Sequence, residues 1–386
     1  MRCVLLSVLV LVACAGAPEP PTREPKPCNA QDGQQHLRAL WNQPWTEECQ
    51  SLLPLAGGPI NISAWAGIEA NAYATAANGS VVGGPAFNGD VVATLYPQDG
   101  TGLYPVFDCQ GPPYSEQTCK AVNGGSPQLG NLTAHLAQWH ADIIRLFPDP
   151  ASTAVVALDR EMWWPIWENN EPDNNTTHYF VYGQVARRLV REKSPGLPPA
   201  AVEAQAKIQW EAACKKWLLC TMQLARKLRP HITWGFYNMP GATGEAGGPE
   251  LDWLWTSVDA LYPSIYLSQP DLPSNFAAVT RVLTEARRVS MLSTPPKPIY
   301  AYTMPEFDDD AWHHTAAPEM TFLDASSFQL EFNHSVSAFA LAGLILYGGS
   351  ADGANPERCT KVREYMTSTF LPAIEAIVRQ RNCQKK

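Results

Sequence analysis

The sequence predicts a single domain with an α/β fold. The expected architecture is a TIM-like (β/α) barrel that need not be regular. Three observations support this prediction. The 386 residues are 45% apolar, enough for a sizeable core. No long Pro/Gly/Ser-rich linker divides the chain after residue 36, and short β-like runs alternate with helical stretches. We therefore expect residues 36–386 to form one barrel, preceded by a signal peptide at 1–17 and an extended segment at 18–35.

Eight apolar runs have the length and composition of barrel strands, the third being the weakest. They span Leu37–Trp41, Ile60–Ala66, Val91–Leu95, Ala154–Leu158, Ile232–Tyr237, Ala260–Tyr266, Pro298–Tyr302 and Gly343–Tyr347. The stretches between them predict helices over Asn131–Leu146, Tyr179–Lys193, Ala201–Leu228, Asn275–Ser290, Ser326–Ala342 and Pro356–Arg379. Apolar residues recur at roughly helical spacing in the longest of these, which we expect to pack against the barrel.

The N-terminus reads as a secretory signal: Arg2, the apolar run Val4–Val12, and then small residues up to Ala17. N-glycosylation sequons at Asn61, Asn78, Asn131, Asn174, Asn175 and Asn333 favour a secreted eukaryotic glycoprotein over a bacterial lipoprotein lipidated at Cys14. We therefore expect a secreted or extracellular protein, or one of the secretory-lysosomal lumen. No membrane anchor is expected, because no stretch of membrane-spanning length follows the signal.

The cysteines predict disulfides and no metal. Removing Cys3 and Cys14 with the signal leaves an even set in an oxidising compartment, namely Cys28, Cys49, Cys109, Cys119, Cys214, Cys220, Cys359 and Cys383. Cys109 and Cys119 can close a small ring, whereas Cys214 and Cys220 lie on different faces of one predicted helix and cannot bond. Neither CxxC nor HExxH is present, and His313-His314 reads as part of a surface loop. We expect no metal and no cofactor.

The formal charge of −9 argues against a nucleic-acid partner, which needs a basic face, and the body of the chain has no Lys/Arg cluster longer than a pair. It also weakens the case for tight binding of a polyanion. Net charge does not describe one groove, however, so a local basic lining remains compatible with it. We expect a monomer.

Two carboxylates, Asp159 and Glu161, follow the apolar run Ala154–Leu158 and are themselves followed by aromatics. In a strand, side chains alternate faces, so both acids would point one way and Arg160 the other. Same-face neighbours lie roughly 6–7 Å apart at Cα. Two such acids repel, and at least one should keep its proton near neutral pH. This arrangement is typical of enzymes that cleave glycosidic bonds.

Aromatic residues stand at the carboxyl ends of other predicted strands, where (β/α) barrels build their active sites. The fifth strand ends at Tyr237, the sixth at Tyr266 and the last at Tyr347. A single tyrosine at such a position can equally well belong to the core. The presence of several beside a carboxylate pair favours a sugar-binding groove.

From Leu37 to Ile377 the chain resembles the animal hyaluronidases. The matching pieces, in order, include Gly102-Leu-Tyr-Pro105, Gly125-Ser-Pro-Gln128, Val155 to Trp167, Trp234-Gly-Phe-Tyr237, Leu261-Tyr-Pro-Ser-Ile-Tyr266 and Cys359 to Tyr365. Asp-x-Glu alone is a weak signal, whereas this ordered series is specific.

The resemblance implies a retaining, substrate-assisted hydrolysis, in which the N-acetyl group of the sugar attacks the anomeric carbon. Glu161 would be the acid and base, and Asp159 would stabilise the acetamido group. Tyr237 and Tyr266 would hold the acetamide and line the cleavage site. The resemblance also implies a disulfide between Cys49 and Cys359.

Departures from the family pattern concern the substrate more than the chemistry. Trp164 stands where the family usually has the arginine of Trp-Arg-Pro, and can stack on a sugar but cannot pair with a uronic carboxylate. Tyr347 stands where a tryptophan is usual, and Gly241 and Ala242 replace an Asp and a Cys. The cysteine-rich C-terminal module of the vertebrate enzymes has no counterpart.

The sequence therefore predicts a secreted endo-β-N-acetylhexosaminidase acting on a glycosaminoglycan, hyaluronan or a chondroitin-like polymer. Two alternatives stay open: a glycosidase for another N-acetylhexosamine polymer, and a carbohydrate-binding or adhesion protein with little turnover. Retention of both Asp159 and Glu161 argues against the last of these.

Overall fold

A computed structural model describes residues 36–42, 62–71, 89–97, 101–170, 173–175, 177–238, 248–267, 271–307, 322–347 and 356–383. The expected signal peptide and the segment 18–35 lie outside these residues. So do Cys28, Cys49, the sequons at Asn61 and Asn78, and the His313-His314 and Gly241-Ala242 positions.

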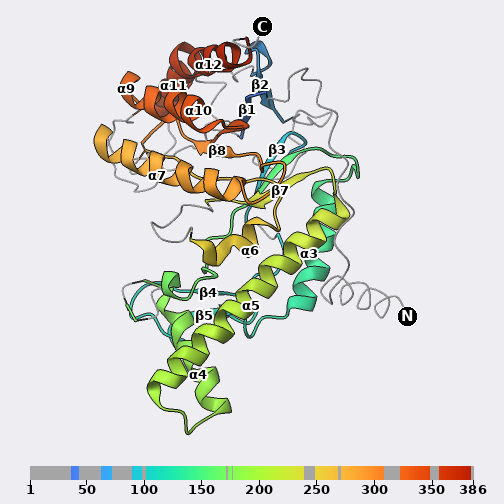
Figure 1. Cartoon of the computed structure of the whole chain (residues 1–386), viewed down its shortest axis with the longest axis vertical. Coiled ribbons are helices and arrows are strands. Elements are labelled where there is room, and N and C mark those ends of the chain that lie inside the picture. Colours follow the sequence, from blue (N-terminus) through green and yellow to red (C-terminus); the bar gives the residue numbers. More distant parts are fainter. Residues whose placement is uncertain are drawn as a thin grey trace.

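Parallel strands form the centre of the molecule (Figure 1). They are β1 Arg38–Trp41, β2 Ile68–Ala70, β3 Val92–Leu95, β6 Val155–Leu158, β7 Thr233–Phe236, β8 Tyr300–Thr303 and β9 Gly343–Leu346. One sheet has the order β2-β1-β9-β8 and the other β3-β6-β7. Parallel bridges from Tyr262 to Tyr237, from Leu261 to Ile299 and from Ser264 to Tyr302 connect β7 to β8. The strands thus follow one another around a barrel.

In the described part of the chain, the side chain of Asn71 joins the two remaining edges, β2 and β3. Asn71 directly follows β2 and is 7% exposed. Its Oδ1 accepts hydrogen bonds from the backbone N–H groups of Val91 (3.0 Å) and Val92 (2.9 Å), and its Nδ2 donates to the carbonyl of Val92 (2.9 Å). Asn71 therefore supplies across this seam the bonds that a backbone ladder supplies elsewhere.

The helices cover the outside of the strands. They are α3 Leu132–Leu146, α4 Phe180–Lys193, α5 Pro199–Leu228, α6 Asp252–Trp255, α7 Leu272–Ser290, α9 Ala325–Phe328, α10 Ser335–Phe339, α11 Pro356–Tyr365 and α12 Leu371–Cys383. Short π-helical turns, η5 Gln329–His334 and η6 Met366–Phe370, join α9 to α10 and α11 to α12. Helices α4 and α5 extend toward one end of the molecule, and α11 and α12 lie at the other, near β1 (Figure 1).

The predicted strand Ile60–Ala66 is wrong. Residues 62–64 form a 3₁₀ turn, and the strand is β2, Ile68–Ala70. The β-branched residues before Ala66 suggested the strand, but pairing with β1 decides its position. A bidentate ion pair from the Arg38 guanidinium to the Glu69 carboxylate (2.7 and 2.6 Å) fixes that pairing.

Two other predicted elements are shorter than expected. Ala260–Tyr266 makes only isolated bridges, because Pro263 in its middle has no N–H to donate. The helix predicted over Ser326–Ala342 contains a π-helical turn and ends at Phe339, where Ala340 takes a left-handed conformation (φ 51°). One hairpin was not predicted: β4 Val106–Asp108 pairs antiparallel with β5 Lys120–Val122.

The barrel interior is a separate cluster of small and aromatic side chains. It includes Val155 and Ala157 of β6, together with Tyr262, Tyr300 and Tyr302. At Gly235 of β7, an added Cβ would lie 2.4 Å from the Ala260 carbonyl and 2.5 Å from the Tyr262 ring. Glycine at this position therefore lets the neighbouring segment and its tyrosine approach closely. In the described part of the chain, no helix is long and apolar enough to cross a membrane.

Candidate active site

Strand register brings three polar residues to one level of the barrel rim. Leu95 of β3 pairs with Leu158 of β6, and Leu158 pairs with Phe236 of β7. The next residues along these strands are Tyr96, Asp159 and Tyr237. The N–H of Asp159 donates to Leu95 and that of Tyr237 to Leu158, each at 3.0 Å. Since parallel strands end at the same edge, these side chains meet there.

Asp159 points into the barrel and is buried, at 9% exposure. Its side chain follows Val155 and Ala157, which belong to the interior cluster. Tyr96 donates a hydrogen bond to its carboxylate. Burial, and then the negative charge of Glu161, nevertheless raise the pKa of Asp159 well above its usual range. The prediction that one acid of the pair keeps its proton is therefore supported for Asp159.

Glu161 is exposed at the rim. Its Oε1 accepts a hydrogen bond from Nδ2 of Asn238 (3.2 Å), and its backbone carbonyl accepts one from the hydroxyl of Tyr179 (2.9 Å). Asn238 has a left-handed backbone conformation (φ 53°), which asparagine tolerates. These contacts fix the backbone of Glu161 and leave its second carboxylate oxygen facing solvent or a ligand.

Tyrosines from four strand ends line the rim beside Asp159. The hydroxyls of Tyr96 and Tyr347 lie 2.5 Å apart, and the rings of Tyr347 and Tyr266 stack at 6.3 Å. The Tyr237 ring meets that of Tyr302 edge-on at 4.7 Å. Burial raises the pKa of Tyr237, so its hydroxyl keeps its proton and can donate. The hydroxyl of Tyr266 is buried and interacts with that of Tyr237.

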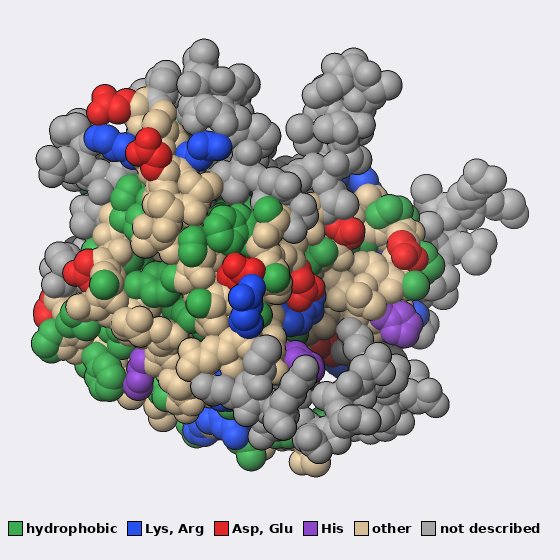
Figure 2. All heavy atoms as spheres, turned by 90° about the horizontal axis from the view of Figure 1, so that it is seen from above, with side chains coloured by type: hydrophobic (Ala, Val, Ile, Leu, Met, Phe, Trp, Pro, Cys, Tyr) green, Lys and Arg blue, Asp and Glu red, His purple; other side chains and the backbone are tan. Residues whose placement is uncertain are grey.

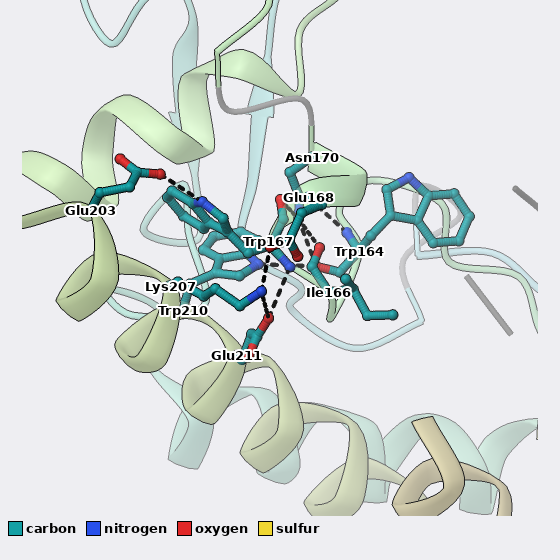
Figure 3. Close-up of polar contacts among 9 residues, drawn as sticks. All are labelled: Trp164, Ile166, Trp167, Glu168, Asn170, Glu203, Lys207, Trp210 and Glu211. Carbon is teal, nitrogen blue, oxygen red and sulfur yellow. Dashed lines mark hydrogen bonds and ion pairs between the residues drawn. The ribbon is translucent and has the colours of Figure 1, made fainter. Parts of the chain in front are cut away.

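Trp164 lies in the loop that follows Glu161. Its backbone N–H donates to Oδ1 of Asn170 (2.8 Å), and its carbonyl accepts bonds from Asn170 and from the indole of Trp210 on α5 (Figure 3). The indole of Trp164 points away from Trp167 and Trp210 and is 7% exposed. Little of its surface is therefore offered to a sugar, and stacking on substrate stays a prediction.

A cavity of about 410 Å³ lies beside the same loop and α5. It is lined by Trp167, Glu168, Asp173, Glu203, Lys207 and neighbours, and none of the carboxylate pair or the rim tyrosines borders it. Its charges are already paired: Lys207 with Glu168, and Arg187 with Asp173 and Glu203. We therefore place the candidate site at the rim and not in this cavity.

The cysteines agree with a secreted protein. Cys109 and Cys119 form a disulfide that closes the β4–β5 hairpin, one of the pairings that the sequence leaves open, and Cys214 is buried and free. Cys220 and Cys359 are disulfide-bonded to cysteines whose side chains lie outside the described set. The specific bond Cys49–Cys359 stays a prediction, because Cys49 lies outside the described residues. Among those described, no group of three or more His, Cys, Asp or Glu could hold a metal.

Sequence reasoning missed three residues that contact the carboxylate pair: Tyr96, Asn238 and Tyr179. Tyr96 and Asn238 directly follow β3 and Tyr237, so their position at strand ends was a signal that could have found them. Tyr179 had no such signal, because it reaches Glu161 from the start of α4.

The face of the molecule seen from above carries both charges. Figure 2 shows acidic and basic side chains interspersed with hydrophobic ones on this face. The excess of acidic residues in the composition thus does not make this face uniformly negative.

Comparisons with known proteins agree on one family. A family model described as hyaluronidase matches residues 34–385. Hyaluronidase-1 of Bos taurus is 31% identical over 300 residues, which are 73% of this chain and 62% of that protein. Hyaluronidase-2 of Rattus norvegicus is 28% identical over 356 residues, 86% of this chain and 67% of that protein.

Among solved structures, bee venom hyaluronidase in complex with a hyaluronic acid tetramer superposes with a TM-score of 0.70 at 24% identity. The match covers 89% of this chain and 99% of the bee venom chain, and it supports the barrel fold. The chain spans about two thirds or less of the length of the two mammalian relatives, 62% and 67%.

Proposed function

The chain belongs to the hyaluronidase family, and from this premise we propose that it is a secreted endo-β-N-acetylhexosaminidase that hydrolyses hyaluronan or a chondroitin-like glycosaminoglycan. One observation carries the proposal: a buried Asp159 with a raised pKa lies beside an exposed Glu161, inside a ring of tyrosines. Such an arrangement separates the tasks of two acids of the same chemical type.

In the proposed reaction, Asp159 holds the proton in the free protein because it is buried. Binding of the sugar over Glu161 removes water from the Glu161 carboxylate. The proton of Asp159 then passes to Glu161. Glu161 then protonates the glycosidic oxygen as the bond from that oxygen to the anomeric carbon breaks. The acetamido oxygen of the sugar forms a new bond to the same carbon, and ionised Asp159 stabilises the positive charge that develops on the acetamido group.

Water completes the cycle. It attacks the anomeric carbon from the side that the leaving group vacated, gives its proton to Glu161, and restores the acetamido group with overall retention of configuration. When the product leaves, the proton returns from Glu161 to Asp159. Asn238 orients the Glu161 carboxylate through its hydrogen bond of 3.2 Å. No covalent link to the protein is needed.

The tyrosines would hold the acetamide. The hydroxyl of Tyr237 keeps its proton and can donate to the acetamido oxygen, and the buried hydroxyl of Tyr266 interacts with that of Tyr237 and would help to orient it. Tyr347 extends the wall and, through Tyr96, links it to Asp159.

A set of polysaccharide substrates tests the proposal. Purified protein is incubated from acid to neutral pH with hyaluronan, chondroitin, chondroitin sulfate and chitin oligosaccharides, and chain length is measured. Shortening of hyaluronan or chondroitin is expected. Shortening of chitin oligosaccharides alone favours a glycosidase for another N-acetylhexosamine polymer, and binding without shortening of any substrate favours a carbohydrate-binding protein.

A further inference from the structure

Arg160 stands between the two carboxylates in sequence and faces the opposite side of the strand. Asp159 continues the interior face of β6, so Arg160 turns outward, toward the helices α4 and α5. It is nevertheless only 3% exposed. A guanidinium is thus enclosed between the barrel wall and its helical cover.

The guanidinium is held by one residue of the following turn. Its Nη1 donates a hydrogen bond to the carbonyl of Trp163 (2.5 Å), and its central carbon lies 3.9 Å from the centroid of the Trp163 ring. The Nε and Nη2 atoms have no hydrogen-bond partner in the described part of the chain. A cation–π contact and one hydrogen bond to a carbonyl do not offset the free-energy cost of removing the guanidinium charge from water.

Among the described residues that interact electrostatically with Arg160, the carboxylate pair supplies the counter-charge. These residues are Tyr104, Tyr182 on α4, Cys214 on α5, Glu161 and Asp159. Burial raises the pKa of Tyr104 to about 12 and raises the pKa values of Tyr182 and Cys214, so all three are neutral. Burial lowers the pKa of Arg160, but arginine starts so high that it stays charged in an enzyme assay.

We propose that Arg160 is the positioning residue of the carboxylate pair. Its buried charge lies behind Asp159 and Glu161, and its contacts with Trp163 fix the turn that carries Glu161. It thereby supplies a positive charge to the carboxylate pair from the opposite face of the strand. The inference rests on the proposed function, because it assigns a role in that same site.

Three variants separate charge from packing. Arg160→Met removes the charge and keeps an unbranched apolar stem, whereas Arg160→Lys keeps the charge and loses the planar contact with Trp163. Arg229→Met is the matched control, because Arg229 is also buried (6%) and donates to the carbonyls of Phe147 and Leu228, before the start of β7. The readouts are the thermal midpoint and the pH profile of kcat/KM on the polymer that the wild type cleaves.

Loss of the Arg160 charge should destabilise the ionised carboxylates of Asp159 and Glu161. In Arg160→Met we expect both limbs of the pH profile to move upward by about 1 pH unit. Arg160→Lys should keep the limbs in place while kcat falls, and Arg229→Met should lower the thermal midpoint without moving either limb. Limbs that stay in place in Arg160→Met overturn the inference, and if that variant does not fold, Arg160→Gln carries the same test.

A readout without turnover separates this inference from the proposed function. If the wild type cleaves no polymer, the proposed function fails, but titration of the Asp159 carboxyl by ¹³C NMR still tests Arg160. An upward shift of that titration in Arg160→Met supports the positioning role, and an unchanged titration overturns it.

Discussion

Asp159 is buried at 9% exposure and Glu161 is exposed, although a single residue separates them. The difference arises because β6 ends at Leu158: Asp159 still faces the barrel interior, whereas Glu161 already belongs to the turn above the rim. Two carboxyl groups with one residue between them therefore have different environments, and the proposed mechanism depends on that difference.

The buried acid should cost stability at neutral pH. Folded Asp159 keeps its proton to a higher pH than unfolded Asp159, so the unfolded chain releases its proton first, and stability falls as pH rises above about 4. We expect Asp159→Asn to melt at a higher temperature than the wild type at pH 7, with the difference vanishing near pH 4. Exposed Asp108→Asn is the control, and equal behaviour of the two variants would argue against a raised pKa of Asp159.

The barrel seam should depend on Asn71. Asn71→Ala leaves the N–H groups of Val91 and Val92 and one carbonyl without their partner, and we expect it to lower the free energy of unfolding by about 2–4 kcal/mol. Asp324→Ala, which removes one N-terminal capping bond of α9, should cost only about 1 kcal/mol. Denaturant unfolding measures both, and equal costs would show that the seam does not need this side chain.

His135 should make the fold sensitive to acid. It is buried between the N–H of Leu103, which donates to its Nδ1 (3.0 Å), and the hydroxyl of Thr221 (2.9 Å from Nε2). Burial lowers the pKa of His135 from 6.5 to about 3, so the unfolded chain binds the proton first. Stability on the order of 4 kcal/mol is then present at neutral pH and lost as pH falls from about 6.5 toward 3.

The variant His135→Gln checks this dependence. It should be less stable than the wild type at pH 7 and lose less on acidification, whereas partly buried His140→Gln serves as the control. The measurement is the unfolding free energy at several pH values. An acid loss as large in His135→Gln as in the wild type would assign the sensitivity to other groups.

Trp164 should act through packing more than through sugar contact. Since it is 7% exposed, we expect Trp164→Phe to lower the unfolding free energy by about 1–3 kcal/mol and to leave KM within about two-fold. An unchanged thermal midpoint with a raised KM would instead support the stacking role that the sequence suggests.

Much of the site could be predicted from local pattern. Period-two alternation placed Asp159 and Arg160 on opposite faces, and the apolar runs located β1, β3, β6, β7, β8 and β9 to within two residues. These features depend on a few neighbouring residues, which the sequence shows directly. The short spacing of Cys109 and Cys119 likewise showed that they could bond, although it did not select this pairing.

Features that depend on contacts between distant segments could not be predicted. The bond from Tyr96 to Asp159 requires β3 to lie beside β6, and the seam requires β2 to end beside β3. The position of β2 itself follows from the pairing of Arg38 with Glu69, which outweighs the low strand propensity of Glu69 and Ala70. The burial of Trp164 likewise depends on how its loop is fastened to α5.

The role of Glu161 as acid and base is the central claim, and the initial rate of polymer shortening tests it. Glu161→Gln is compared with the wild type and with Glu168→Gln, a matched control whose side chain is 60% exposed and pairs with Lys207 on α5. We expect Glu161→Gln to lose about a thousand-fold or more and Glu168→Gln to stay within about two-fold. A Glu161→Gln variant that shortens the polymer at a rate close to that of the wild type would contradict the account.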